Sequence, residues 1–180
     1  MSGGLLQDFF PSLYSPLRAA EPPDMIQSFF PSIYSPAADV AASLIGIPRT
    51  RQADTIMLAI AGQESRWTHR AQIGGPARGF WQFEKGGGVA GVLTHRATAE
   101  RARGLCSALR IEADQATVYE ALRWDDTLAV GFARLLLWTD PKALPTAPRP
   151  AWDCYMRTWR PGTPHLATWR ARWDAAMSIV

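Results

Sequence analysis

Apolar residues recur at helical spacing along most of this chain, and no window alternates as a β-strand would. The first pattern begins at Ser35-Pro36 and stops at Gly46, and the second runs from about Gln52 to Ser65. A Ser cap before a first-turn Pro, and a Gly after the last turn, are typical helix signals. Later helices are expected over 89–95, 97–109, 114–123, 125–138, 150–159 and 166–177. The sequence therefore predicts a mainly α-helical protein.

Composition excludes several classes of protein. With 180 residues, of which 47% are hydrophobic, the chain can bury one real core. The net charge is only +3 and no stretch is dense in Lys or Arg, so we expect no nucleic-acid partner. No run reaches the ~18 apolar residues of a membrane span. The N-terminus also lacks a signal-peptide pattern, so we expect synthesis in the cytoplasm without an export route of its own.

Residues 1–36 contain a tandem repeat with an offset of twenty. Residues 7–16 return as residues 27–36, with eight of ten positions identical. Because each copy contains two prolines, we expect an extended tail at 1–36 and a helical domain at 37–180. Each copy has the form of a docking motif, Phe-Phe-Pro-Ser-(Leu/Ile)-Tyr-Ser-Pro, whose projecting anchors would be Phe9, Phe10, Tyr14, Phe29, Phe30 and Tyr34. The alternative is a duplicated segment that packs on its own domain.

Glu64 is the acidic residue with the most unusual predicted surroundings. It continues the apolar stripe of its helix, which is formed by Ala53, Met57 and Ile60. It also lies near the C-terminal end of that helix, where the helix dipole opposes negative charge, and Trp67 follows closely. Both effects favour a protonated carboxyl, as a general acid requires. The alternative is an ordinary ion pair with Arg66 or Arg70.

The residues after Glu64 carry a family resemblance. Glu64-Ser65, an aromatic residue, two alanines, Gly79 and Gln82 resemble, at matching spacing, the motif of lytic transglycosylases of the lysozyme-like superfamily. In that family the Glu ends a helix, and the segment from Gly to Gln forms a wall of the sugar groove. The resemblance implies a lysozyme-like helical domain that cleaves the MurNAc–GlcNAc bond of peptidoglycan glycan strands and needs no cofactor. Phe80-Trp81 stand where the family has Leu-Met.

The same resemblance assigns roles to individual residues. Glu64 would protonate the leaving oxygen and then, as a carboxylate, accept the proton of the muramic acid 6-hydroxyl, which closes a 1,6-anhydro ring. A downstream block similar to residues 151–155 places Tyr155 as the tyrosine that hydrogen-bonds this Glu. The substrate-binding residues would be Ser65, Gly79, Phe80, Trp81, Gln82, Glu84 and Tyr155.

Other readings of the acidic residues and the cysteines stay open. A hydrolytic muramidase would need a second carboxylate, for which Glu84, Asp125 and Asp126 are candidates. For either Asp, a helix N-cap is the simpler interpretation. Cys106 and Cys154 have no metal-ligand spacing, so no metal site is expected, and they form either one disulfide or two buried thiols.

The chain also resembles lysozyme-like proteins encoded by bacteriophages, in the runs Gly-Gly-Pro-Ala-Arg-Gly-Phe-Trp-Gln-Phe-Glu and Trp-Arg-Pro-Gly-x-Pro-His. This resemblance implies an enzyme carried in the phage virion, anchored to other virion proteins through residues 1–36 and acting on the host cell wall. Two alternatives follow. One is a structural virion protein with a lysozyme-like fold and little or no catalysis. The other is a hydrolytic endolysin.

Overall fold

The computed structural model describes residues 22–180, and this part of the chain is mainly α-helical, as predicted, with no β-strand in it. In chain order the elements are α1 (Pro22–Phe29), η1 (Phe30–Tyr34), α2 (Ser35–Ile45), α3 (Arg51–Ser65), η2 (Lys85–Val89), α4 (Ala90–Thr94), α5 (Ala99–Ala108), α6 (Gln115–Ala121), α7 (Asp126–Trp138), α8 (Pro148–Thr158) and α9 (Leu166–Ile179). η1 and η2 are single π-helical turns. None of the helices in the described range is both long and apolar enough to cross a membrane.

Local signals set the helix ends. The Thr50 side chain caps α3 by accepting a hydrogen bond from the Ala53 amide, and Asp125 caps α7 through the Leu128 amide at 2.8 Å. The α2 pattern ends as predicted, because Gly46 adopts φ 62°, a left-handed conformation that favours glycine. Helix boundaries are therefore encoded mainly by residues at the boundaries themselves.

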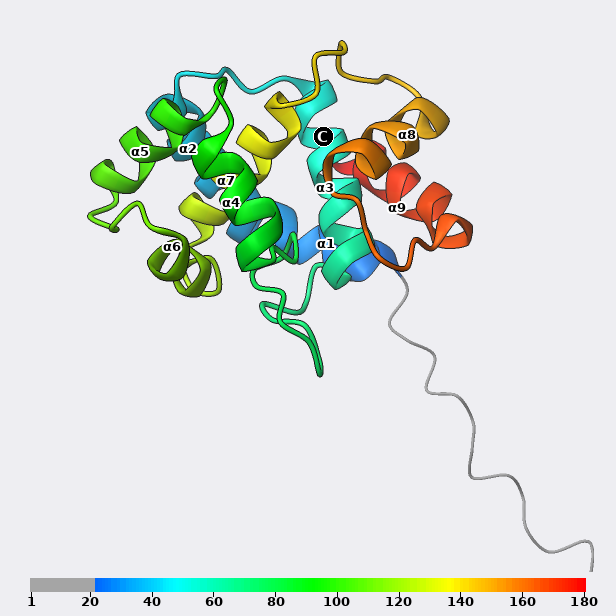
Figure 1. Cartoon of the computed structure of the whole chain (residues 1–180). Coiled ribbons are helices and arrows are strands. Elements are labelled where there is room, and N and C mark those ends of the chain that lie inside the picture. Colours follow the sequence, from blue (N-terminus) through cyan, green and yellow to red (C-terminus); the bar gives the residue numbers. More distant parts are fainter. Residues whose placement is uncertain (1–21) are drawn as a thin grey trace, which may run out of the picture.

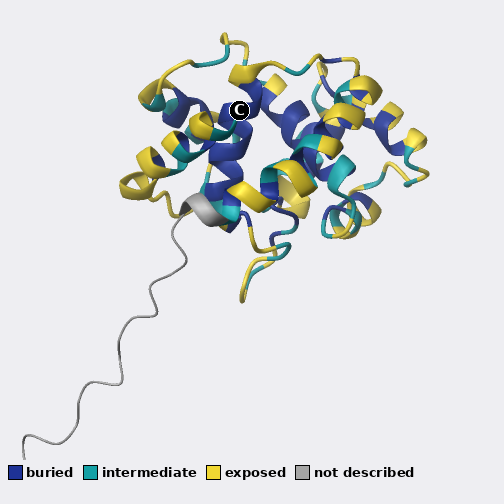
Figure 2. Cartoon of the chain, turned by 180° about the vertical axis from the view of Figure 1, so that it is seen from behind, coloured by how far each residue is buried: buried dark blue, intermediate teal, exposed yellow. Residues whose placement is uncertain are grey.

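Helix α3 lies in the middle of the molecule, with α9 packed along one side of it and α7 on the other (Figure 1). Helices α2 and α5 pack on α7, and α1 and α8 pack on α9. Buried residues line the inward faces of these helices, while the outer faces are exposed (Figure 2). The core is continuous, because α3 is buried along nearly its whole length between its neighbours.

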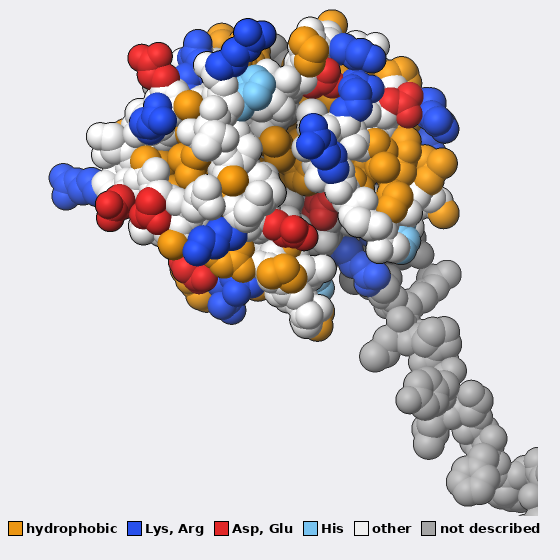
Figure 3. All heavy atoms as spheres, viewed as in Figure 1, with side chains coloured by type: hydrophobic (Ala, Val, Ile, Leu, Met, Phe, Trp, Pro, Cys, Tyr) orange, Lys and Arg blue, Asp and Glu red, His pale blue; other side chains and the backbone are white. Residues whose placement is uncertain are grey.

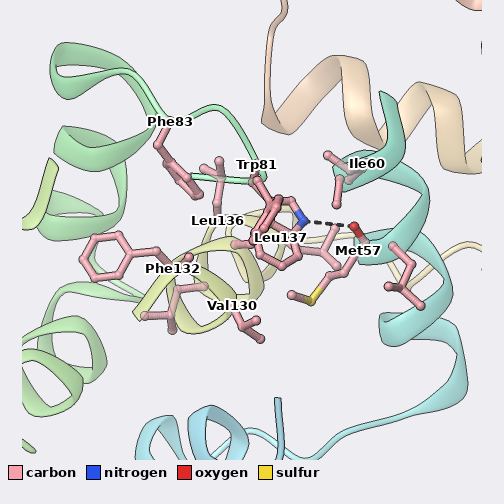
Figure 4. Close-up of a cluster of buried hydrophobic side chains, with 14 of the residues drawn as sticks. Met57, Ile60, Trp81, Phe83, Val130, Phe132, Leu136 and Leu137 are labelled. Atoms are coloured by element: carbon pink, nitrogen blue, oxygen red, sulfur yellow. Dashed lines mark hydrogen bonds between the residues drawn. The ribbon is translucent and has the colours of Figure 1, made fainter. Parts of the chain in front are cut away.

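Trp81 joins α3 to the rest of the core. Its indole Nε1 donates to the Met57 carbonyl at 2.9 Å, and its ring lies among apolar side chains of α3 and α7 (Figure 4). The segment between Ser65 and Lys85 has only isolated bridges, Ala71 to Arg78 and Arg78 to Phe83. This segment is therefore mostly loop, and the Trp81 hydrogen bond attaches its C-terminal part to α3.

The prediction of an extended tail up to residue 36 is wrong for its described part. Helical residues run without a break from Pro22 to Ile45, and the side chains of Phe29 and Tyr34 are buried in the core. Neither ring can therefore project as a docking anchor, while Phe30 is half-buried against the core. The first-copy anchors Phe9, Phe10 and Tyr14 lie outside the described residues.

Pro31 explains why the sequence predicted extended backbone where the structure has a helix. Proline fixes φ near the helical value but removes a donor and crowds the carbonyl four residues earlier. The wider η1 turn relieves this crowding, and the Ser35 amide then bonds to the Phe30 carbonyl five residues back. The helix tolerates the proline because its other face is fixed in the core.

Two other expectations are now decided. Three consecutive glycines, residues 86–88, suggest a flexible hinge, but they lie within the η2 turn. A side chain at Gly88 would meet the Phe83 ring at 2.6 Å, so the glycine serves close packing there. Cys106 and Cys154 are both free and buried, so they are two separate thiols rather than a disulfide.

Candidate active site

A groove of about 910 Å³ crosses one face of the molecule and contains Glu64. It is lined by the end of α3, the segment from Gln72 to Glu84, the η2–α4 region, the end of α7, and the chain from Tyr155 to His165. The surface seen in Figure 3 carries Lys and Arg side chains scattered over it rather than gathered in one patch. The groove thus brings together five segments that are far apart in the sequence.

Glu64 lies in the last turn of α3, half-buried at the groove. The helix stops immediately after it, because Arg66 and Trp67 both adopt left-handed φ values of 56° and 57°. The Trp67 indole folds back and donates to the Leu58 carbonyl at 2.8 Å. Gly62 makes room for this ring, since a Cβ there would lie 2.3 Å from it. This packing fixes the end of α3 and therefore the position of the carboxyl.

Tyr155 is the direct partner of Glu64. Its hydroxyl donates a hydrogen bond to Oε1 of Glu64 at 2.5 Å, which is the contact that the family resemblance implied. The Tyr155 ring stacks on Trp169 with centroids 5.4 Å apart and also contacts Trp152. Tyr155 is consequently held in an aromatic cluster between α8 and α9. This packing restricts the ring and keeps its hydroxyl within hydrogen-bond distance of the Glu64 carboxyl.

The pKa of Glu64 is raised from 4.5 to about 7. Burial is the main cause, because it penalises the charged carboxylate, and the negative charge of Glu84 adds to it. The hydrogen bond from Tyr155 acts in the opposite direction, because it stabilises the carboxylate. Burial and the neighbouring carboxylate also raise the pKa of Tyr155, so this side chain stays a donor. Glu64 is therefore poised to give and take a proton near neutral pH.

The alternative role of Glu64 in a helix-end ion pair is not observed. Arg70 instead forms a bidentate pair with Asp126, with N–O distances of 2.5 and 2.9 Å. Its guanidinium also lies 4.6 Å from the centre of the Phe80 ring. None of the ion pairs found within residues 22–180 involves Glu64. Its carboxyl therefore faces the groove without a cation to hold it ionised.

Gln82 and Glu84 line the groove with Glu64. Gln82 adopts φ 49°, a strained conformation for a residue with a side chain, and its Nε2 donates to the Gly79 carbonyl at 2.7 Å. The Glu84 side chain is exposed, and its charge acts on Glu64 across the groove. Backbone strain held in place at a groove wall is a common mark of a functional site.

The other predicted substrate-binding residues do not line the groove. Ser65, Gly79, Phe80 and Trp81 are all buried. Ser65 Oγ donates to the Ala61 carbonyl at 2.9 Å, and both aromatic rings belong to the core. A Cβ at Gly79 would lie 2.8 Å from the Leu122 carbonyl oxygen, so this glycine permits close packing. These four residues support the groove wall from behind, because the bulky rings gain more by burial than by facing solvent.

Several groove residues were not identified from the sequence, among them Trp159, Arg160 and Gln63. The Trp159 indole is half-buried between Phe83 and Tyr155, and its Nε1 donates to the Trp81 carbonyl at 3.1 Å. Arg160 follows with φ 51°, and Gln63 Nε2 donates to the His165 carbonyl at 3.0 Å. The Trp-Arg-Pro-Gly run was the available signal, but it gave no indication that this loop packs beside α3.

The remaining acidic candidates have structural roles. Asp125 caps α7, and Asp126 pairs with Arg70, so neither lines the groove. Among residues 22–180 no group of three or more His, Cys, Asp or Glu side chains is placed to hold a metal ion. The groove thus contains two carboxyls, those of Glu64 and Glu84.

Comparison with known proteins adds no further constraint, because no protein-family model, curated protein or solved structure matches this chain.

Proposed function

We propose that this chain is a glycosidase of the lytic transglycosylase type, which cleaves the MurNAc–GlcNAc bond of peptidoglycan with Glu64 as its acid and base. The observation that carries the proposal is the Glu64–Tyr155 pair at the groove, with the pKa of the carboxyl at about 7. A lysozyme-like helical fold is part of the same proposal.

The chemistry needs one carboxyl that changes its protonation state twice. Protonated Glu64 gives its proton to the glycosidic oxygen as the bond from this oxygen to C1 of MurNAc breaks. The leaving sugar departs with a free hydroxyl. The Glu64 carboxylate then takes the proton of the C6 hydroxyl while that oxygen bonds to C1 and closes a 1,6-anhydro ring. Glu64 ends protonated and ready for another cycle, and no water is consumed.

The groove has features that suit a glycan strand. A volume of about 910 Å³ is large enough for several linked sugars. The Trp159 side chain is half-buried, lies near Tyr155 and lines the same groove as Glu64, so its ring offers an apolar face on which a sugar ring can stack. Polar side chains such as Gln82 and Thr158 line the same groove and can bond to sugar hydroxyls.

A hydrolytic muramidase is the second candidate, because Glu84 also lines the groove and acts on the charge of Glu64. In that reaction Glu84 would activate a water molecule or stabilise positive charge at C1. The substrate is the same, and only the fate of the C1 atom differs.

Incubation of the purified protein with peptidoglycan, followed by mass spectrometry of the fragments, tests the proposal. We expect anhydro-muramyl ends. Glu64→Gln should reduce the rate by about 10²- to 10⁴-fold, the usual contribution of a general acid and base. Glu112→Gln, at an exposed position outside the groove, is the matched control and should keep full activity. Reducing ends would favour the hydrolase, and absence of products, or full activity in Glu64→Gln, would contradict both reactions.

A further inference from the structure

The second repeat copy occupies a well-defined site in the core. The Tyr34 side chain is fully buried, and its hydroxyl donates to Oδ1 of Asp54 at 2.7 Å. The Arg49 guanidinium lies 5.7 Å from the centre of the Tyr34 ring and donates to Ser35 Oγ at 3.1 Å. The hydroxyl groups of Tyr34 and Ser35 therefore both have specific hydrogen-bond partners.

The phenylalanine of the same copy has an equally specific place. The Phe29 ring packs edge-on against Phe80 with centroids 4.7 Å apart, and 6.5 Å from the centre of the Trp81 ring. Ile26, one turn earlier, is fully buried as well. We call the side chains that receive this copy the repeat-binding site: Arg49, Asp54, Met57, Phe80 and Trp81.

Residues 5–16 offer the same side chains to this site as residues 25–36. Phe9, Tyr14 and Ser15 correspond to Phe29, Tyr34 and Ser35. The positions that differ keep the character that the site requires: buried or half-buried Met25, Ile26 and Ile33 correspond to Leu5, Leu6 and Leu13, and exposed Ser28 corresponds to Asp8. Every contact of the second copy with the repeat-binding site thus has an equivalent donor or ring in the first.

The equivalence ends after the last proline of each copy. Ala37 and Ala38 are buried, and the first copy would place Leu17 and Arg18 there. A larger side chain overpacks such a position, and an unpaired buried charge is costlier still. An exchange between the copies must therefore keep α2 from Ala37 onward in place.

We infer that the repeat-binding site is a peptide-binding site with two competing occupants in the same chain, residues 25–36 and residues 5–16. In the exchanged state the chain slips by twenty residues, and residues 17–36 form a loop that rejoins α2 at Ala37. Closing a loop of this length lowers the equilibrium constant for replacing the second copy with the first by on the order of 100-fold. The second copy is therefore the main occupant.

Helix signals reinforce this preference. Pro22 and Pro23 precede the second copy, and proline is favourable in the first turn of a helix. Ser2 and Gly3 occupy the corresponding positions before the first copy, so the first copy lacks both prolines there, and glycine starts a helix poorly. Substitutions that weaken the binding of the second copy should therefore increase the fraction of molecules in which the first copy occupies the site. This inference does not depend on the chemistry proposed for Glu64.

A mutant cycle between the two copies, in the full-length chain, tests the exchange. Phe9→Ala with Tyr14→Ala should leave the unfolding equilibrium unchanged. Phe29→Ala with Tyr34→Ala should raise the unfolding constant by on the order of 100-fold, because the first copy then takes the site at the cost of the loop. All four substitutions together should raise it by more than about 10⁴-fold, the usual effect of two truncated aromatic rings. Equal instability of the second-copy variant and the fourfold variant would overturn the inference, as would an unfolded second-copy variant.

Hydrogen exchange with peptide mass spectrometry locates the occupant directly. In the variant with Phe29→Ala and Tyr34→Ala, amides of residues 7–14 should become protected and those of residues 27–34 should exchange freely. Light scattering should show a monomer. Protection that stays on residues 27–34, or rescue that occurs only in a dimer, would overturn the exchange within one chain.

Discussion

The Tyr155 hydroxyl donates a 2.5 Å hydrogen bond to Oε1 of Glu64, although 91 positions separate the two residues in sequence. The bond joins the end of α3 to the last turn of α8 and acts on the pKa of the groove carboxyl. Burial raises the pKa of Glu64, and this hydrogen bond limits the rise. The effects of Tyr155 and Glu84 on the site can therefore both be tested by measuring the pKa of Glu64.

Tyr155→Phe should raise the pKa of Glu64 further above about 7, because the lost hydrogen bond stabilised the carboxylate. A hydrogen bond to a charged group contributes about 1.5–3 kcal/mol, so a rise of about one to two pH units is expected. The ring itself should keep its stacking on Trp169. Carbon-13 NMR titration of the Glu side chains measures the shift. Tyr119→Phe, outside the groove, is the control, and an unchanged Glu64 pKa in Tyr155→Phe would refute the assigned role.

Glu84→Gln should lower the pKa of Glu64, because it removes a negative charge that disfavours the Glu64 carboxylate. The same NMR titration measures this change. In the transglycosylase reaction this variant keeps anhydro-muramyl products, since Glu64 works alone. Loss of all products, with Glu64 still titrating, would indicate that Glu84 is the second carboxylate of a hydrolase.

Glu64 should make the folded protein less stable as the pH rises. Its pKa is about 7 in the folded state against an ordinary 4.5, so the folded state binds more protons between these values. The stability contributed by its protonated form is complete below pH 4.5 and is lost as the pH passes 7. The shift corresponds to about 3 kcal/mol in the free energy of unfolding. Urea unfolding at pH 4.5 and pH 8 should show that Glu64→Gln narrows this difference; an equal pH dependence in both proteins would argue against a raised pKa.

Gln63 should act as a positioning residue for the groove loop that ends at His165. Its Nε2 donates to the His165 carbonyl, and its Oε1 accepts a hydrogen bond from Thr168, both at 3.0 Å. Gln63→Met removes both bonds and should raise KM by about 2- to 10-fold, as expected for bonds of 0.5–1.5 kcal/mol. The Glu64 titration should not change. Thr168→Val removes only one of the two hydrogen bonds of Gln63, together with the bond from Thr168 to the His165 carbonyl, and leaves the Gln63–His165 bond in place, so its effect should be smaller. A large loss of kcat in Gln63→Met would instead place Gln63 in the chemistry.

Gly131 and Gly104 both lie in helices, and replacing each by alanine should change the free energy of unfolding in opposite directions. A Cβ at Gly131 would lie 2.4 Å from a methyl carbon of Leu105, whereas nothing lies within 4 Å of a Cβ at Gly104. Gly131→Ala should lower the free energy of unfolding by about 1–3 kcal/mol through overpacking. Gly104→Ala should raise it by about 0.5–1 kcal/mol, because alanine favours a helix. Urea unfolding checks both, and stabilisation by Gly131→Ala would contradict the packing of α5 on α7.

The sequence by itself determined the helical class, most helix boundaries and the position of Glu64. These features depend on short-range signals: apolar spacing, the capping side chains of Thr50 and Asp125, and Gly46 at a helix end. The stripe of α3 also placed Glu64 at the end of a buried helix. Such signals can be read from a sequence because the interacting groups are few residues apart.

Only the tertiary structure decided which residues line the groove and which support it. Phe80 and Trp81 were predicted in the groove wall. In the structure, Phe29 of the second repeat copy and the apolar face of α3 form a core, and burial there stabilises the two rings more than exposure in the groove would. The groove is instead lined by Trp159, because the chain that follows α8 lies at the end of α3. The same long-range packing holds Pro31 within a helix. Spacing along the chain gives the face of each helix, whereas the neighbour that meets this face depends on how all the helices pack together.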